Sequence, residues 1–488
     1  MSIKNKTISG LKWSFTDNMV NQAIHFVIGL VLARLLSPTE YGIIGMAMVF
    51  IAVSQTFIDS GLSQALIRKT DCSEADYNTM FYTNIALGVA TFSIVFFAAG
   101  AISRFYDNPD LYLLTRVMAI NLIINSFGMV ETAMLTRQVD FKRQTKISLI
   151  SNVSSGIIGI VLAFIGFGYW SLAIRTICQN SFRVLLLHYT SSWKPKLVYS
   201  IESFKELFGF GSKLLIAGII DTAYRNIYKL VIGKYFSATE LGFYTRAQQF
   251  KNLPSQNIQN TTQRVTYPVL ASMIGDDRKL KAGYKKLIKL MFYLTSTLML
   301  LMIINAREIV LILIGEQWAS SIDYLKIICI SGMLYPLHSL NLNMLKAKGR
   351  SDLFLRLEII KKIMVIPVIV IGIRFGMIVM LWGMVFNSFF AYLINAFYSA
   401  RLINYSTIEQ LKDIAPTFVH TLIMAGLAFA VGTIAPSHLF LSLFMKTGVA
   451  LLYLIGAGYL FKIPEYMELK ELGIEQFKHH IAPLLHKK

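Results

Sequence analysis

Long, mostly apolar stretches recur along the whole chain, and short polar segments separate them. A bilayer hydrocarbon core about 30 Å thick requires roughly 20 mostly apolar residues in a helix. With that window, the pattern predicts about fourteen membrane-spanning helices and therefore an all-α integral membrane protein. The expected spans are 13–33, 41–67, 77–103, 111–136, 147–167, 169–187, 206–231, 239–270, 287–305, 324–345, 359–373, 377–398, 415–433 and 441–461.

Composition and charge support a membrane location. Hydrophobic residues make up 55% of the sequence and charged residues only 15%, whereas soluble domains carry about 25% charged residues. The formal net charge is +20, and basic clusters at 137–146, 278–289 and 346–356 fall in loops on one side of the predicted topology. The positive-inside rule places these loops and both termini in the cytoplasm. We therefore expect a multi-pass membrane protein, and the basic excess requires no nucleic acid partner.

Residues that could carry catalysis or bind a metal are scattered. Cys72, Cys178 and Cys329 lie far apart and are too few for a disulfide framework or a metal cluster. The sequence has no phosphate-cradling glycine loop, no nucleophile elbow and no His/Glu set at metal-ligand spacing. We therefore expect a transporter and not an enzyme, with no metal and no cofactor beyond H⁺ or Na⁺ coupling.

A short turn motif occurs twice, 200 residues apart. Residues 36–42 read LSPTEYG after the first span, and residues 236–242 read FSATELG after the seventh. An even number of spans separates the copies, so both halves enter the membrane in the same direction, as in a parallel repeat about an axis along the membrane normal. The alternative is a recurrent capping turn, because Ser or Thr followed by Glu satisfies free amides at a helix start.

The repeat predicts four parts of the chain. We expect an N-terminal six-helix lobe at 1–190 and a basic cytoplasmic linker at 191–205. A second six-helix lobe follows at 206–400, and two additional transmembrane helices with a cytoplasmic tail occupy 401–488.

This plan resembles the polysaccharide-transporter branch, the Wzx-like oligosaccharide flippases, of the multidrug/oligosaccharidyl-lipid/polysaccharide flippase superfamily. The turn LSPTEYG, the segment IVLILIGEQW at 309–318 and the amphipathic opening KNKTISGLKWSF at 4–15 carry the resemblance. It implies two lobes in a V shape that open alternately to each side. It also implies that the protein flips undecaprenyl-pyrophosphate-linked oligosaccharide repeat units for capsule, O-antigen or exopolysaccharide biosynthesis. The implied partners are this lipid-linked oligosaccharide, membrane lipids, a polysaccharide polymerase and glycosyltransferases.

The eighth span carries a polar stripe. A charge inside a membrane helix costs about 2.5–3.5 kcal/mol on insertion scales and usually faces a cavity or a partner. Pro254 interrupts this span, which makes the alignment of the stripe approximate. Arginine offers phosphate a planar fork of donors, and amides suit sugar hydroxyls, so we expect the stripe to bind the substrate. At about 100° per residue, these side chains share one arc: Arg246, Gln249, Gln256, Asn257, Asn260 and Arg264.

The seventh span holds Asp221, Arg225 and Lys229 at four-residue intervals, close to one helical face. Arg225 and Lys229 are further candidates for substrate binding, with an Asp221–Arg225 pair inside the helix as the alternative. Asp17 and Asp221 lie at similar depths in equivalent spans and are candidates for ion coupling. For Asp17 the alternative is an interfacial position near the cytoplasmic end.

The first half offers fewer cations within its spans. Its second span carries Gln55, Asp59 and Gln64, so a pyrophosphate would bind on one side of a central cleft while sugars occupy the rest.

Three other functions fit parts of the pattern. A multidrug exporter of the same superfamily would need acidic residues for cationic drugs, whereas the stripe is cationic. A peptidoglycan lipid II flippase shares the core plan and the charge, and the turn motif favours the polysaccharide branch. A membrane glycosyltransferase or ligase would need an acidic cluster near a large loop, and the loops here are short and basic.

Overall fold

The computed structural model describes residues 20–59, 61–273, 275–434 and 438–476, apart from the side chains at 260–269, 271, 351 and 472–476. Every regular element within these residues is a helix. Nine of the described helices are long and apolar enough to cross a membrane. Within the described residues, each predicted span coincides with one helix or one closely spaced pair, the first of them from residue 20 on. The chain is an all-α integral membrane protein, as predicted.

Contacts divide the chain into two compact units, Met1–Thr245 and Arg246–Lys488. This boundary falls inside α10 (Ala238–Ser272), whereas the predicted lobes are separated at 191–205. The division into two six-helix lobes, their V-shaped arrangement and the linker stay predictions.

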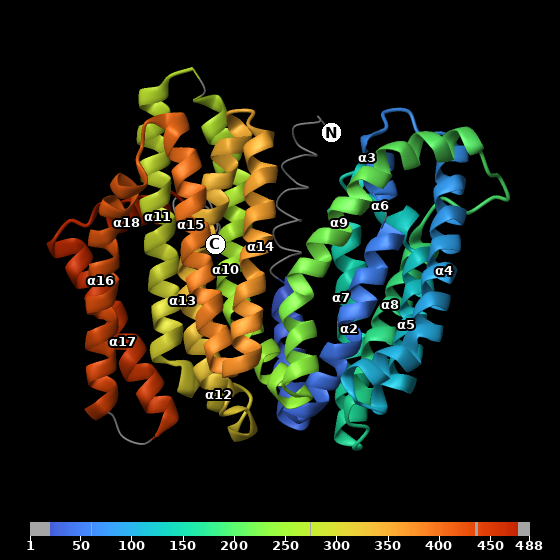
Figure 1. Ribbon diagram of the computed structural model, residues 1–488, viewed down its shortest axis with the longest axis horizontal. Helices are drawn as coiled ribbons and strands as arrows, with labels where there is room; N and C mark the ends of the chain where they lie inside the picture. Colours follow the sequence, from blue (N-terminus) through green and yellow to red (C-terminus); the bar gives the residue numbers. More distant parts are fainter. Residues whose placement is uncertain (1–19, 60, 274, 435–437, 477–488) are drawn as a thin grey trace, which may run out of the picture. The chain divides into compact units, whose positions relative to one another are not determined.

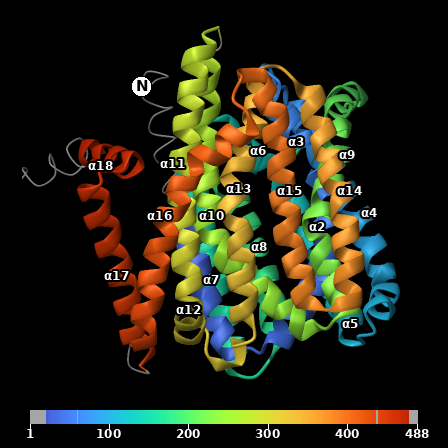
Figure 2. The same ribbon diagram turned by 60° about the vertical axis from the view of Figure 1, so that its left-hand side comes forward.

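The first unit is a bundle in which neighbouring helices pack in pairs. Contacts join α4 to α5, α7 to α8, and α9 to α2, and Figures 1 and 2 show the same pairing. The helices are one at Val20–Leu35, then α2 Pro38–Asp59, α3 Leu62–Arg68, α4 Glu74–Tyr106, α5 Asp110–Phe127, α6 Met129–Arg137, α7 Phe141–Phe164, α8 Tyr169–Thr190 and α9 Ile201–Tyr235.

In the second unit, α13 packs between α11 and α15, and α14 packs on α15. Figure 2 shows the last three helices on one side of α11. The helices that follow α10 are α11 Asp277–Ile304, α12 Ala306–Leu313, the 3₁₀ helix η1 Glu316–Trp318, α13 Ser321–Ala347, α14 Ser351–Phe375, α15 Met377–Ile403, α16 Thr407–Ile434, α17 Leu439–Leu460 and α18 Pro464–Gln476.

Two predicted spans are broken by short turns. The second becomes α2 and α3, separated around Gly61, whose φ of 69° lies in the left-handed region that glycine adopts without strain. The fourth becomes α5 and α6, with Gly128 between them. In contrast, α10 continues through Pro254. The interruption expected there is therefore wrong, and the helix passes the missing hydrogen bond without ending.

The ends of several helices are fixed by capping side chains. At the start of α4, the Ser73 hydroxyl accepts from the Asp76 amide at 3.2 Å and Asp76 accepts from the Ser73 amide at 2.9 Å, a complete capping box. Asp140 and Asp276 accept from the amides three residues later at the starts of α7 and α11. Each such cap satisfies a free amide and contributes about 1 kcal/mol.

The last helices are fastened to the second unit by ion pairs. Lys446 of α17 lies 2.5 Å from Glu308 of α12, where the Glu308 side chain is buried and that of Lys446 is 12% exposed. Along α11, four lysines pair with carboxylates of α16 and α18 at distances of 2.8 to 3.1 Å. The partly exposed pairs contribute little each, whereas breaking the buried pair would leave an uncompensated charge.

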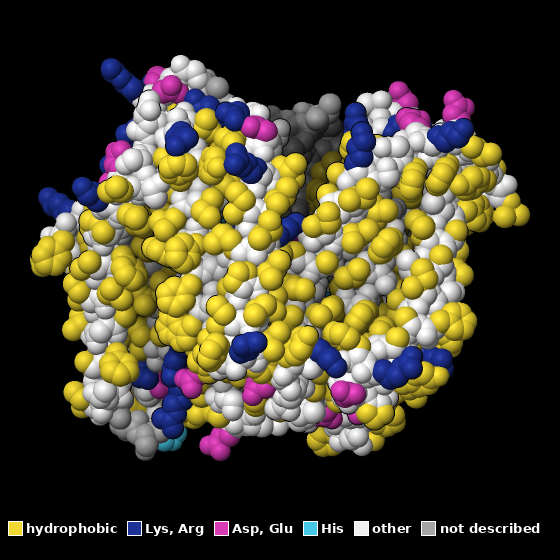
Figure 3. Space-filling view, viewed as in Figure 1, with side chains coloured by type: hydrophobic (Ala, Val, Ile, Leu, Met, Phe, Trp, Pro, Cys, Tyr) yellow, Lys and Arg dark blue, Asp and Glu magenta, His cyan; other side chains and the backbone are white. Residues whose placement is uncertain are grey.

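The outer surface suits a lipid environment. In Figure 3 each unit shows a broad area of apolar side chains, with Lys, Arg, Asp and Glu gathered mainly toward its upper and lower margins. Phe97, Phe164 and Leu452 are 79%, 80% and 72% exposed. Large apolar surfaces of this kind mark contact with a membrane or a partner.

Candidate functional site

The two copies of the repeated turn begin α2 and α10 with the same local chemistry. In the first, the Ser37 amide donates to Glu40 at 2.6 Å, and the Glu40 amide donates to the Ser37 hydroxyl at 3.4 Å. In the second, the Glu240 amide donates to the Ser237 hydroxyl at 3.0 Å. The shared Ser and Glu are therefore explained by helix capping, the alternative to duplication.

The shared Thr and Gly have a different explanation, because the two turns lie in contact. The Thr39 and Thr239 hydroxyl oxygens are 2.8 Å apart. A Cβ atom added at Gly42 would overlap the Ala238 carbonyl oxygen, and one added at Gly242 would overlap the Pro38 carbonyl oxygen. These contacts are reciprocal, as an axis relating two repeats requires. The predicted parallel repeat, in which Thr39 matches Thr239 on the same face, stays a prediction.

The polar stripe of α10 is only partly described. Arg246 is buried, donates to Gln249 at 2.6 Å and lies over the Trp318 ring, 5.7 Å from its centroid. These contacts compete with the substrate-binding role predicted for Arg246. Gln256 and Asn257 are exposed, and Asn257 donates to the Leu253 carbonyl at 2.8 Å.

Two members of the stripe, Asn260 and Arg264, belong to α10, but their side chains lie outside the described residues. Asp17 also lies outside the described residues. Their predicted roles stay predictions.

The polar residues of α9 form the intrahelical pair that was the alternative for them. Arg225 lies 2.8 Å from Asp221, one turn apart, with side-chain exposures of 75% and 48%. Lys229 lies one turn further along and is half-buried. An exposed pair retains its capacity to bind other groups, so the contact does not decide between packing and substrate binding.

A polar pocket of about 550 Å³ occupies the first unit. Its lining comes from the last turns of α2, from α3, from the end of α5, from α6, from the second half of α8 and from the first half of α9. The paired turns involve the first residues of α2 and α10, so the pocket and the turns lie at opposite ends of α2. The lining includes these polar side chains: Gln55, Thr56, Asp59, Ser63, Gln64, Asn125, Thr132, Thr136, Asn180 and Arg183.

Hydrogen bonds connect the pocket's polar side chains across helices. Asn125 of α5 donates to Gln55 of α2 at 3.0 Å, and Gln55 donates to Asp59 at 3.2 Å. Arg183 of α8 interacts electrostatically with Asp59. The pocket therefore brings one carboxylate and one guanidinium into the same bundle, with amides between α2 and α5 joined by hydrogen bonds.

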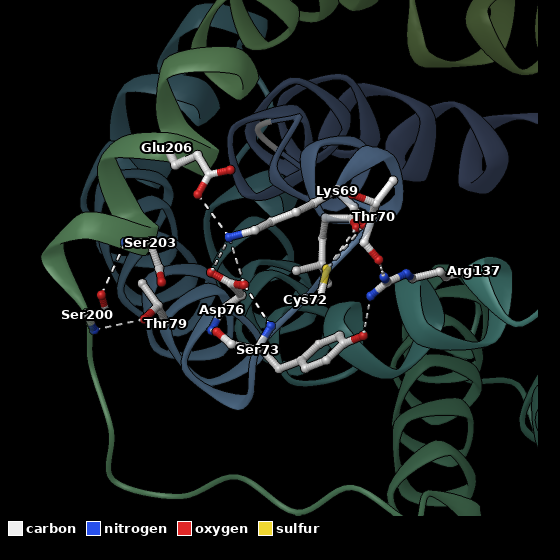
Figure 4. A network of polar contacts seen from close by, with 12 residues as sticks. Lys69, Thr70, Cys72, Ser73, Asp76, Thr79, Arg137, Ser200, Ser203 and Glu206 are labelled. Carbon is white, nitrogen blue, oxygen red and sulfur yellow. Dashed lines mark hydrogen bonds and ion pairs between the residues drawn. The ribbon is translucent and has the colours of Figure 1, made fainter.

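Beside the pocket, a second network fastens the turn between α3 and α4, and Figure 4 shows its residues pointing toward one another. Lys69 Nζ lies 2.9 Å from Asp76 and 2.9 Å from Glu206 of α9. Hydrogen bonds with Glu206 and Asp76 raise the pKa of Lys69 above its usual value. Arg137 of α6 donates to Tyr77 at 2.7 Å and to the Thr70 carbonyl.

Sequence reasoning singled out Gln55, Asp59 and Gln64 as polar residues of the second span but missed Asn125, Asn180 and Arg183. The signal that marked Gln55, Asp59 and Gln64, a polar side chain inside an apolar span, could also have marked the three missed residues. The sequence did not indicate that α2, α5 and α8 bring these residues to one pocket.

The chain is similar in sequence to a protein family and to several curated proteins. The profile of a family described as polysaccharide biosynthesis protein matches residues 31–323. The chain is 27% identical over 378 residues to the lipopolysaccharide biosynthesis protein WzxC of Escherichia coli, with 76% of each chain covered. It is 27% identical over 365 residues to the teichuronic acid biosynthesis protein TuaB of Bacillus subtilis, covering 72% of this chain and 73% of that one.

A third relative was found by sequence, and two solved structures share the fold. The succinoglycan biosynthesis transport protein ExoT of Rhizobium meliloti is 23% identical over 391 residues, with 79% of each chain covered. The lipid II flippase MurJ in an inward closed conformation gives a TM-score of 0.73 at 14% identity, over 93% of this chain and 99% of that one. A multidrug resistance MATE family transporter gives 0.64 at 16% identity, over 79% and 94%. At these identities the two structures show the fold alone.

Proposed function

Because the chain belongs to the polysaccharide biosynthesis protein family, we propose that it is a flippase that carries undecaprenyl-pyrophosphate-linked oligosaccharide repeat units across the bacterial inner membrane. It acts by alternating access and serves capsule, O-antigen or exopolysaccharide biosynthesis. The relative named as a succinoglycan biosynthesis transport protein supports transport, and not catalysis, as the activity. Its partners are the lipid-linked oligosaccharide and the surrounding lipids, with a polysaccharide polymerase and glycosyltransferases acting after and before it.

The observation that carries this proposal is the polar pocket inside a unit of apolar, membrane-spanning helices. Polar groups inside a membrane bundle are costly unless they face one another, water or a substrate. A flippase needs such groups because the sugars of its substrate cross a medium that cannot solvate them. The pocket supplies hydrogen-bonding groups for that passage.

Two observations favour this function over its rivals. A multidrug exporter would present acidic groups to cationic drugs, whereas Arg183 balances Asp59 in the pocket. The likeness to the lipid II flippase is one of fold, while the family profile and the relatives concern surface polysaccharides. The polysaccharide assignment is therefore the better supported of the two.

Complementation of a flippase-null strain tests the proposal. We expect the wild-type chain to restore surface polysaccharide. Arg264→Ala should reach the membrane at normal abundance yet lower export, because Arg264 is proposed to hold the pyrophosphate with charge-assisted hydrogen bonds. Arg264→Lys should retain part of the activity, since the charge survives without the fork geometry.

The outcomes separate three cases. Full export by Arg264→Ala at normal abundance rejects the pyrophosphate role. Loss of the variant from the membrane assigns the residue to packing instead. Failure of the wild-type chain to restore any polysaccharide rejects the flippase assignment for that pathway.

We further propose that both termini are cytoplasmic, which the loop charges favour. In a variant without native cysteines, Ala282→Cys should resist a membrane-impermeant thiol reagent applied from outside, whereas Asp107→Cys should react. The proposed topology places the pocket on the cytoplasmic side and the paired turns on the periplasmic side. The reverse labelling pattern would show the opposite orientation, with the pocket on the periplasmic side.

A further inference from the structure

The pocket of the first unit is balanced in charge, unlike the cationic stripe of α10. Its volume of about 550 Å³ falls within the roughly 300–1,000 Å³ typical of small-molecule sites. Among the described residues that line it, Asp59 and Arg183 are the charged ones, so the lining has no net formal charge. A pyrophosphate would meet the Asp59 carboxylate, and an organic cation would meet the Arg183 guanidinium. A neutral polar ligand fits this balance best.

The amides of the pocket retain hydrogen-bonding capacity in both directions. Asn125 donates to Gln55 at 3.0 Å, and Asn180 donates to Asn121 at 2.8 Å. An asparagine carries two N–H donors and a carbonyl with two lone pairs. These bonds therefore leave each asparagine a second donor and its carbonyl. Sugar hydroxyls both donate and accept hydrogen bonds, so they can pair with the donors and with the acceptors of these amides.

Aliphatic side chains complete the lining. Val184 and Leu187 come from α8, and Leu214 and Leu215 come from α9. The C–H faces of a sugar ring are apolar and lose unfavourable contact with water when they pack on such groups. Amides together with aliphatic carbon are what a saccharide needs from a binding surface.

Close backbone contacts hold the α9 side of the pocket in place. A Cβ atom added at Gly61 would lie 2.6 Å from the Gly211 carbonyl oxygen, and one added at Gly218 would lie 3.1 Å from the Thr56 methyl group. The Thr56 hydroxyl also donates to Thr222 of α9 at 3.0 Å. The shape of the pocket is therefore fixed by packing before a ligand arrives, which lowers the cost of binding.

We propose that this pocket is a saccharide-binding subsite, which holds neutral sugar residues of the lipid-linked oligosaccharide while the pyrophosphate binds elsewhere. The inference rests on the proposed flippase function and adds a location and a ligand class to it. It gives Asn125, Asn180 and Arg183 roles in recognising sugars, with Asp59 offsetting the charge of the guanidinium.

Binding to the purified full-length protein in lipid nanodiscs tests the subsite with three probes. The first is the intact lipid-linked oligosaccharide from a flippase-null strain that accumulates it. The second is the free oligosaccharide released from it by mild acid, and the third is undecaprenyl pyrophosphate without sugar. The double variant Asn125→Ala/Asn180→Ala should weaken binding of the first two probes about ten-fold, from the loss of two or more hydrogen bonds. Its affinity for the third probe should be unchanged.

A second variant and a control variant distinguish loss of sugar binding from loss of folding. Leu215→Trp leaves the amides in place and fills the pocket, so it should weaken binding of the same two probes. Gln144→Ala removes an amide of α7 that does not line the pocket, and it should bind all three probes like the wild type. Thermal unfolding of each variant in nanodiscs shows whether the fold is retained.

The results separate the subsite from the flippase function. If folded Leu215→Trp and the asparagine variant bind the free oligosaccharide like the wild type, the subsite is rejected and the flippase proposal stands. If these variants weaken binding of undecaprenyl pyrophosphate as much as binding of the intact probe, the pocket holds the pyrophosphate and the saccharide assignment is wrong. If the wild type binds none of the intact probe, the flippase proposal fails and the subsite with it.

Discussion

The two ends of α2 are packed in opposite ways. At its start, Gly42 lies so close to Ala238 that no side chain fits between the backbones. At its end, Gln55 and Asp59 line a pocket of about 550 Å³. A transporter that opens to one side at a time needs a helix pair that can close by contact at one end while the other end admits substrate. We therefore expect α2 to serve both purposes, with backbone contact at one end and polar side chains at the other.

The largest effect is expected at the closed end. Gly42→Ala or Gly242→Ala would place a methyl group on a backbone carbonyl oxygen of the facing turn, and backbone cannot rotate away as a side chain can. Overpacking of this kind costs about 1–3 kcal/mol or more. We expect each variant to lower surface polysaccharide about ten-fold or more, and thermal unfolding of the purified protein to shift downward.

Gly426→Ala is the matched control, because a Cβ there has no neighbour within 4 Å. It should leave export unchanged and stabilise α16 slightly, since alanine favours a helix over glycine by about 1 kcal/mol. Equal behaviour of Gly42→Ala and Gly426→Ala would show that the turns do not need close contact. The hypothesis that the start of α2 closes by backbone contact would then be rejected.

The second effect concerns the charges of the open end. Asp59→Asn leaves Arg183 without its balancing charge, and Arg183→Gln does the same to Asp59. We expect either change to lower export about five-fold, and the double variant to export more than either alone, because an unpaired charge in a bundle costs more than a neutral pair. A double-mutant cycle of export, corrected for membrane abundance, shows whether Asp59 and Arg183 are coupled. Strictly additive losses would show that the two residues act independently.

Much of the fold could be predicted from hydropathy alone. The expected spans coincide with the observed helices because a bilayer forces apolar stretches of a fixed length. The two turns were also visible in the sequence, since Ser37, Glu40 and their counterparts cap helix starts wherever the motif occurs. What hydropathy could not show is that α9 packs against α2, because hydropathy describes one helix at a time and does not name its neighbour.

The candidate site was harder to predict for a physical reason. Helical periodicity places Arg246 and Gln249 on one face, and the structure shows them bonded to each other in a buried position. Periodicity gives a direction around one helix and nothing about the neighbouring helix. Asn125 and Asn180 are single polar residues on two different helices, so no periodic pattern marks them. Their role follows only from helix packing.

A smaller effect is expected at the network beside the pocket. Lys69 bridges Asp76, which is buried, and Glu206, whose side chain is 58% exposed. Lys69→Ala strands the Asp76 carboxylate and should destabilise the protein by about 1 kcal/mol. Glu206→Ala should have a smaller effect, because an exposed ion pair contributes little. Thermal unfolding at low and high salt checks this order, and a larger loss for Glu206→Ala would contradict it.

The smallest effect is expected at the Thr39–Thr239 contact. The hydroxyl oxygens are 2.8 Å apart but exposed, so each hydroxyl can bond to water when its partner is removed. Thr39→Val keeps the side-chain shape and should cost less than about 1 kcal/mol. Thr39→Val/Thr239→Val should be no worse than the single variant, because no hydroxyl then loses a partner. Export by both variants within about two-fold of the wild type would assign the closure of this end to the glycines. A loss as large as that of Gly42→Ala would instead make the hydroxyl pair essential, and the close approach of the backbones would serve only to bring the two hydroxyls together.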